Sequence, residues 1–183
     1  EVYVFWRKVF HGQIRDMVAS VSNDGGTTFA EPVRVAEDNW KINGCPESGP
    51  VAVAVGHRVY VAWMTEAEQQ HAGVKLSWTD DGGKSFAPAV LASQGMLDAN
   101  HPSLSAAADS HAALVFQGRD AQKDGGWSLF RPYLVEIDES GTVSKPFVLS
   151  EDAASASYPV IALGPAGRAF VAWTGTGEKT ARI

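Results

Sequence analysis

The sequence predicts an all-β protein, specifically a β-propeller built from four-stranded antiparallel blades. Its first indication is a glycine-rich turn, Ser22-Asn23-Asp24-Gly25-Gly26-Thr27-Thr28-Phe29, which returns in the same form at Thr79-Asp80-Asp81-Gly82-Gly83-Lys84-Ser85-Phe86. A looser version begins at Asp138, so that Asp24, Asp81 and Asp138 are spaced 57 residues apart. A fixed period of this size is typical of repeat architectures, in which each repeat is one supersecondary unit.

Two further sets of landmarks keep nearly the same period. A strand-like run ending in an aromatic residue occurs four times, ending at Trp6, Trp63, Phe116 and Trp173, with spacings of 57, 53 and 57 residues. Prolines that open another strand follow Cys45, His101 and Tyr158, with spacings of 56 and 57 residues. Because three independent landmarks agree, the repeat spans essentially the whole chain.

Each repeat divides into four short strands, taken in order along the chain. The first follows the proline, the second ends in the aromatic residue, the third precedes the Asp-Gly-Gly turn, and the fourth is a short apolar piece after it. The first strands are expected at 50–55, 102–107 and 159–163, the third at about 14–21, 74–78 and 129–137, and the fourth at 33–36, 89–92 and 147–150. Runs such as Val51–Val55 are apolar on both faces, as expected for strands packed between adjacent blades.

The blade repeats are expected at approximately 1–44, 45–100, 101–157 and 158–183, which is about three and a third blades. Propellers close at about four to eight blades. The sequence therefore predicts a partial propeller, with the remaining blades of the same chain as its structural partners.

Composition excludes several classes of partner. The net charge is −6 and no block of like charges is present, which argues against nucleic acid and anionic membranes, because both require a basic face. No apolar run reaches membrane-spanning length. Cys45 is the only cysteine, so no internal disulfide is expected.

The two turns resemble the Asp-box, or bacterial neuraminidase repeat, of the sialidase-like β-propeller superfamily. They match the pattern Ser/Thr-x-Asp-x-Gly-x-Ser/Thr-Phe at Ser22, Asp24, Gly26, Thr28, Phe29, Thr79, Asp81, Gly83, Ser85 and Phe86. The resemblance implies a fragment of a six-bladed propeller without a cofactor, in a secreted, periplasmic or cell-surface protein. It also implies that these turns are structural and that the ligand site lies at the opposite end of the blades.

The first functional hypothesis is a non-catalytic module that binds a glycan or a protein through this opposite face. The candidate ligand-binding residues there are Trp40, Lys41, Asn43, Cys45, His101, Tyr158 and Arg119. Trp40 is the best candidate for stacking on a sugar, because it is expected in a loop between Asn39 and Lys41.

Two alternatives remain open at this point. A sialidase-type hydrolase needs arginines for a carboxylate, a tyrosine nucleophile activated by a glutamate, and an acid/base. The candidates for these roles are Tyr158 with Glu66 or Glu151, Arg7, Arg119 and Asp120, although the Phe/Tyr-Arg-Ile/Leu-Pro signature that resemblance would require is absent. The second alternative is a metal site at the channel mouth formed by Cys45 and His101, a plausible pair of ligands.

Overall fold

The computed structural model describes residues 1–42, 44–46, 48–67, 71–107, 111–123, 129–151, 155–165 and 168–176. The regular structure in this part of the chain is β-strand, with a short 3-10 turn, η1 (His11–Gln13). No helix in these residues is long and apolar enough to cross a membrane.

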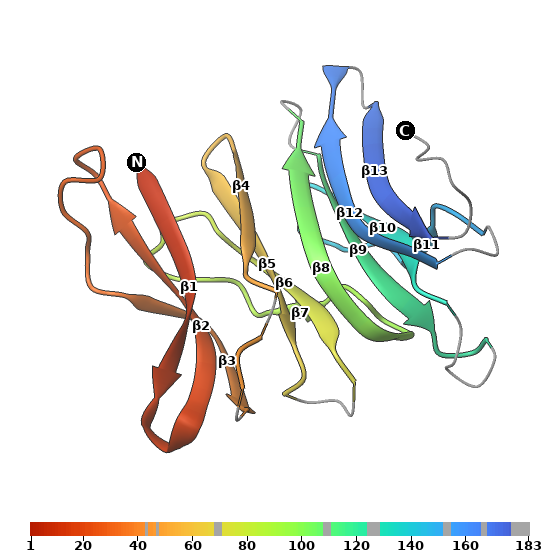
Figure 1. Cartoon of the computed structure of the whole chain (residues 1–183). Coiled ribbons are helices and arrows are strands. Elements are labelled where there is room, and N and C mark those ends of the chain that lie inside the picture. Colours follow the sequence, from red (N-terminus) through yellow and green to blue (C-terminus); the bar gives the residue numbers. More distant parts are fainter. Residues whose placement is uncertain are drawn as a thin grey trace.

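The strands form four antiparallel sheets that stand side by side in chain order (Figure 1). The first sheet contains β1 (Val2–Phe10), β2 (Ile14–Ser22) and β3 (Val33–Lys41). The second contains β4 (Val51–Val55), β5 (Arg58–Thr65), β6 (Gly73–Thr79) and β7 (Val90–Leu91). The third contains β8 (Met96–Ala106), β9 (Ala112–Asp120), β10 (Arg131–Ile137) and β11 (Phe147–Val148). The fourth contains β12 (Ser155–Leu163) and β13 (Ala169–Thr176). The predicted all-β partial propeller is therefore confirmed.

The core lies between the sheets, which explains why strands such as β5 are apolar on both faces. Tyr60 and Ala62 face the third sheet and pack in a cluster with Leu114. Val61 and Trp63 face the first sheet and pack in a second cluster with residues such as Met17. β5 thus contributes side chains to two inter-sheet layers.

Three strands are longer than the sequence predicted. β3 continues to Lys41 instead of ending near Ala36, and β8 and β12 begin several residues before Pro102 and Pro159. All three extensions contain register shifts, because extra residues bulge out of the ladder. A strand interrupted in this way has no regular alternation of polar and apolar residues.

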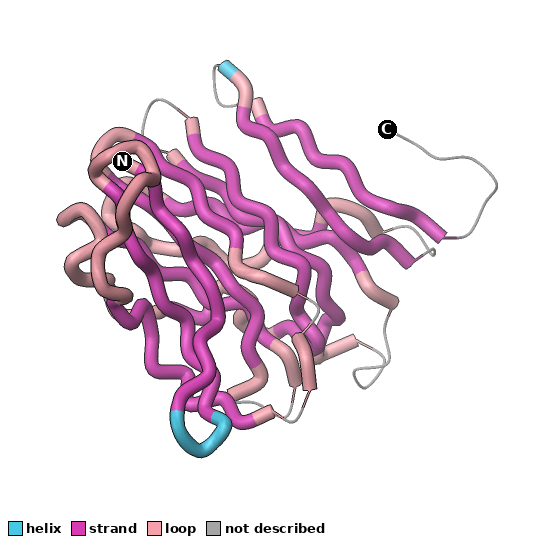
Figure 2. Tube along the Cα trace, turned by 60° about the vertical axis from the view of Figure 1, so that its left-hand side comes forward, coloured by secondary structure: helices cyan, strands magenta, loops and turns pink. Residues whose placement is uncertain are grey.

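The blades have two distinct ends. The Asp-Gly-Gly turns follow β2 and β6, and they lie at the same end as the turn between β4 and β5; we call this end the turn rim. At the other end lie η1, the N-terminal halves of β2, β6, β8, β10 and β12, and the C-terminal halves of β1, β3, β5 and β9; we call this end the loop face. Figure 2 shows η1 at the opposite end of the first sheet from the N-terminus.

Candidate functional site

The polar groups of the first turn on the turn rim are engaged within the turn itself. The Asp24 carboxylate accepts hydrogen bonds from the Ser22 hydroxyl at 2.7 Å, the Thr28 amide at 2.9 Å and the Thr28 hydroxyl at 2.6 Å. These bonds, led by those from Thr28, hold the pKa of Asp24 well below its usual range. The Asp24 carboxylate therefore makes its hydrogen bonds within the turn and stabilises it.

The second turn repeats this arrangement. Asp81 accepts from the Ser85 hydroxyl at 2.6 Å and the Thr79 hydroxyl at 2.9 Å, and the hydrogen bonds led by those from Ser85 lower its pKa to about 2. Asp138 accepts from the Ser140 hydroxyl at 2.6 Å and holds a shorter version of the turn. The third copy, weak in sequence, therefore keeps the same physical device.

The loop face differs because strained backbone gathers there. Non-glycine residues adopt positive φ at Gln13, Asn39, Asp98, His101 and Tyr158, with φ between 50° and 62°. Each such residue costs about 1–3 kcal/mol, and positions of this kind cluster at ligand-binding and active sites. All five lie on the loop face.

Unpartnered buried polar atoms gather at the same end. Among the described residues, the buried side-chain atoms without a hydrogen-bond partner are Arg7 Nη1, Arg15 Nε, Asp16 Oδ2, Asn100 Oδ1 and Arg119 Nε. Buried polar atoms in folded proteins are nearly always paired, so each exception calls for a physical reason. The strain and the unpaired atoms together mark the loop face as the candidate functional site.

His101 and Tyr158 form an aromatic pair on this face. Their ring centroids are 4.5 Å apart and the planes are tilted by 54°. The Tyr158 amide donates to Gln117 Oε1 at 2.7 Å, which holds the bulge in β12, and the Tyr158 side chain is 58% exposed. The structure thus brings two predicted site residues together, from neighbouring sheets.

An ionic cluster lies beside the bulge in β8. Asp98 contacts His71 Nδ1 at 3.2 Å and Arg119 Nη1 at 3.4 Å. The guanidinium of Arg119 also lies 4.4 Å from the ring centroid of Phe130. Arg119 is a candidate ligand-binding residue from the sequence, whereas nothing in the spacing of His71 and Asp98 indicates that they meet.

The prediction that Trp40 lies in a loop is wrong. Trp40 lies in β3, where the bulge extends the strand. Its side chain is only 4% exposed, and the Arg7 guanidinium lies 4.6 Å from its ring centroid. Arg7 Nη2 in turn donates to the Met64 carbonyl at 2.6 Å. One face of the indole is therefore occupied by a cation of the protein itself.

The remaining candidates are more dispersed. Lys41, Cys45 and Glu66 are exposed or partly exposed, whereas Asn43 lies outside the described residues. Asp120 accepts a hydrogen bond from the Gln122 amide at 2.9 Å and caps its own turn. Within the described residues, no hydrogen bond joins the Tyr158 hydroxyl to Glu66 or Glu151, and no group of three or more His, Cys, Asp or Glu side chains is placed to hold a metal ion.

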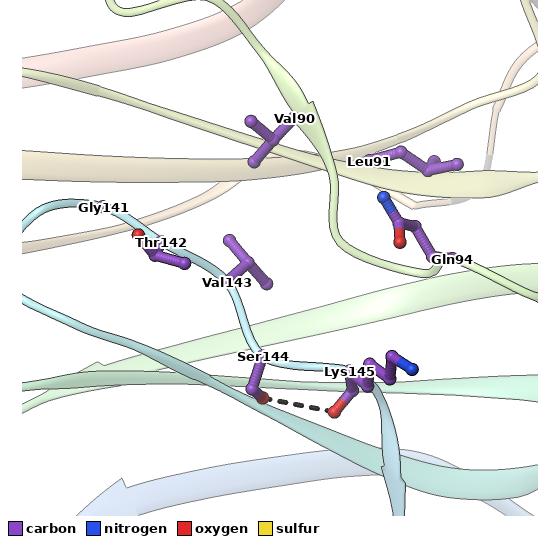
Figure 3. A pocket seen from close by; sticks show the side chains of 8 residues that line it. All are labelled: Val90, Leu91, Gln94, Gly141, Thr142, Val143, Ser144 and Lys145. Carbon is purple, nitrogen blue, oxygen red and sulfur yellow. Dashed lines mark hydrogen bonds between the residues drawn. The ribbon is translucent and has the colours of Figure 1, made fainter.

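A pocket of about 250 Å³ lies between β7 and the segment 141–145 (Figure 3). Val90 and Leu91 line one side, and Val143 with the exposed Lys145 lines the other. It contains none of the strained or unpartnered residues. The pocket is therefore separate from the candidate site.

No protein-family model and no curated protein matches this sequence. Solved structures do match, at low sequence identity. An α-L-arabinanase of Penicillium chrysogenum, solved with arabinobiose, is 15% identical with a TM-score of 0.55, over 94% of this chain and 58% of that one.

Two sialidases give similar matches. The Hadza microbial sialidase Hz136 is 13% identical with a TM-score of 0.53, over 92% of this chain and 41% of the other. The NanB sialidase of Streptococcus pneumoniae is 10% identical with a TM-score of 0.50, over 91% and 26%. The chain thus has the fold of sialidase-like β-propellers and spans only part of the length of each.

Proposed function

We propose that this chain belongs to a ligand-binding β-propeller and that its loop face binds a carbohydrate. The observation that carries the proposal is the asymmetry between the two ends. The carboxylates of the turns at the turn rim are engaged, whereas the strained residues and the unpartnered polar atoms all lie on the loop face.

The chemistry of His101, Tyr158 and their neighbours suits a sugar. The exposed ring of Tyr158, braced by His101, offers an apolar surface for the C–H face of a pyranose or furanose. Asp98 lies in β8, the strand that carries His101, and Arg119 lies in the neighbouring β9. They supply an acceptor and donors for hydroxyl groups. Such a mixture of aromatic surface and a few fixed polar groups is typical of small-ligand sites.

The proposal is tested by screening the protein against a glycan panel and then measuring affinity for the best ligand. Tyr158→Ala and His101→Ala are expected to weaken binding about tenfold, the loss of one well-placed aromatic contact. Phe170→Ala is the matched control, because Phe170 is also exposed but lies toward the turn-rim end of β13. The proposal fails if no glycan binds, or if the Tyr158 variant binds as tightly as the wild type. Capture of a protein that Tyr158→Ala abolishes, without glycan binding, would favour a protein ligand on the same face.

Hydrolysis of the sialidase type is a second candidate. It is favoured by the exposed Tyr158 and by arginines on the loop face that retain unpartnered N–H groups, such as Arg7 and Arg119. Turnover of a fluorogenic sialoside, abolished by Tyr158→Phe or Arg119→Ala, would support this reaction. Full activity in both variants would reject the residue assignment.

A further inference from the structure

Two arginines are neighbours on the face of the first sheet that packs against the second sheet. In the β1–β2 ladder Arg7 pairs with Met17 and Val9 pairs with Arg15, so that Arg7 and Arg15 are diagonal neighbours on one face. Met17 is buried in the same cluster as Trp63 of the second sheet. The two arginines therefore lie where the first two sheets meet, at the loop face.

The guanidinium of Arg7 is fixed from two sides. Nη2 donates to the Met64 carbonyl at 2.6 Å, and the group stacks over Trp40, which is paired with Arg15 in the β2–β3 ladder. Arg7 Nη1 and Arg15 Nε are both buried, and neither has a hydrogen-bond partner. Two donors of like-charged side chains thus lie close together and remain free.

Asp38, the carboxylate that acts electrostatically on Arg7, is already engaged. Asp38 accepts from Lys75 Nζ at 3.0 Å and from Trp63 Nε1 at 2.7 Å. Burial lowers the pKa of Arg7 below its usual value, with Asp38 opposing this effect and Arg15 adding to it.

The other buried acid of this sheet is Asp16, which follows Arg15 in β2 and therefore lies on the opposite face of the sheet. Its carboxylate accepts from the Asn39 amide at 2.7 Å and pairs with Arg34 at 3.6 Å. In the described part of the chain neither Arg7 nor Arg15 forms an ion pair. The Arg7–Arg15 pair therefore has an excess of positive charge without a counter-charge of its own.

We infer that Arg7 and Arg15 form a binding site for an oxyanion, namely a carboxylate, sulfate or phosphate group. Planar guanidinium groups bind such anions through paired N–H donors, and removal of the anion's hydration is offset by charge-assisted hydrogen bonds. The site lies on the second and third strand positions of a blade, away from the innermost strands that carry His101 and Tyr158. It is therefore separate from the proposed carbohydrate site at His101 and Tyr158, although it shares Arg7 with the sialidase-type candidate.

The test titrates the intact protein with sodium sulfate, while sodium chloride holds the ionic strength constant. The Nε–Hε signals of the arginines report binding in ¹⁵N-labelled protein. We expect a saturable shift in the wild type, and about tenfold or weaker affinity in Arg15→Gln and Arg7→Gln, from the loss of a charged hydrogen bond.

Lys8→Gln is the matched control, since it removes the same charge from the opposite face of β1 and leaves the pair intact. Arg15→Gln decides the outcome if Arg7→Gln does not fold, because Arg15 takes no part in the contacts of Arg7 with Met64 and Trp40. Equal affinity in Arg15→Gln and wild type would overturn the inference.

Parallel titrations with sodium phosphate, sodium glucuronate and uncharged glucose separate the sources of the anion. Binding of glucuronate but not glucose, weakened by Arg15→Gln, would identify an acidic sugar. Tighter binding of sulfate or phosphate, with the same sensitivity, would identify a free or esterified inorganic anion. Absence of saturable shifts with all three anions would overturn the inference, whatever the glycan panel shows for Tyr158.

Discussion

At the scale of single residues, the turn rim depends on glycines that pack tightly against side chains of the neighbouring sheet. Gly83 has φ of +80°, and a Cβ placed on it would lie 2.6 Å from Val21 Cγ2. Gly141 has φ of +86° and lies against Trp78 in the same way. Since Val21 and Trp78 are 57 residues apart, this contact between successive sheets is repeated with the period of the chain.

Gly83→Ala is expected to lower the free energy of unfolding much more than Gly26→Ala. Both alanines would adopt a left-handed conformation, at a cost of about 1–2 kcal/mol. Only the first must also displace Val21, since nothing lies within 4 Å of a Cβ at Gly26, and such overpacking costs about a further 1–3 kcal/mol. Urea unfolding of the two variants measures the difference. Equal losses of free energy would show that Val21 can move away from the new Cβ without a loss of stability.

Asp81 is expected to make stability sensitive to acid. Its pKa is lowered from 3.8 to about 2 in the fold, so its contribution is complete above the unfolded value and is lost as the pH falls toward about 2. Asp81→Asn should therefore melt at a lower temperature near neutral pH, and its deficit should shrink between about pH 4 and about pH 2. Glu31→Gln, at an exposed acid beyond the first turn, is the control. A deficit that does not change with pH would contradict the role assigned to the charge.

At the scale of elements, adjacent sheets are joined by a buried polar contact. Asp38 at the bulge of β3 binds Trp63 of β5 and Lys75 of β6, and all three side chains are nearly or fully excluded from solvent. Asp38→Asn keeps an acceptor for the indole but removes the charge opposite the ammonium group. We expect a loss of about 3 kcal/mol, because one charged partner is removed from a buried ion pair.

Denaturant unfolding of Asp38→Asn measures this loss, and Asp80→Asn provides the comparison. Asp80 pairs with Arg58 at 2.7 Å, but its side chain is 39% exposed, so removal of its charge should cost less than about 1 kcal/mol. Equal losses of the free energy of unfolding in the two variants would show that burial does not strengthen the contribution of the Asp38–Lys75 pair to stability.

The sequence period was sufficient to predict the strands and their antiparallel order, because each landmark marks a turn or a buried strand end. It did not predict the bulges of β3, β8 and β12. A bulge breaks the two-residue alternation and places Asn39, His101 and Tyr158 in a conformation that propensity disfavours. Trp40 was expected in a loop for this reason.

At the scale of the whole molecule, the unpredicted bulges also limited how much of the candidate site could be predicted from the sequence. The repeat period aligns His101 with Tyr158, each directly before the proline of its strand, and the structure brings their rings together. It could not reveal the contacts of Arg15, Asp98 or Gln117, because these contacts depend on how far each bulge shifts a strand. Turn chemistry is local and periodic, whereas the contacts of the loop face are neither.

The outer faces of the two terminal sheets expose apolar side chains. Val4 lies on the face of the first sheet directed away from the second and is 42% exposed, and Phe170 lies on the face of the fourth sheet directed away from the third and is 62% exposed. Exposed apolar faces of this kind drive association, and the edge strands beside them add unpaired backbone groups. The 183-residue chain is therefore expected to self-associate through these faces.

The double variant Val4→Lys with Phe170→Lys should shift the 183-residue chain toward monomer in sedimentation velocity at equal concentration. Phe147→Lys should not, although Phe147 is 64% exposed, because it lies on the short outer strand β11 and not on a terminal face. Charge on the terminal faces acts because a lysine brought against a second apolar sheet loses its hydration without gaining a partner. A monomeric wild type, or dissociation by Phe147→Lys alone, would show that the terminal faces do not govern association.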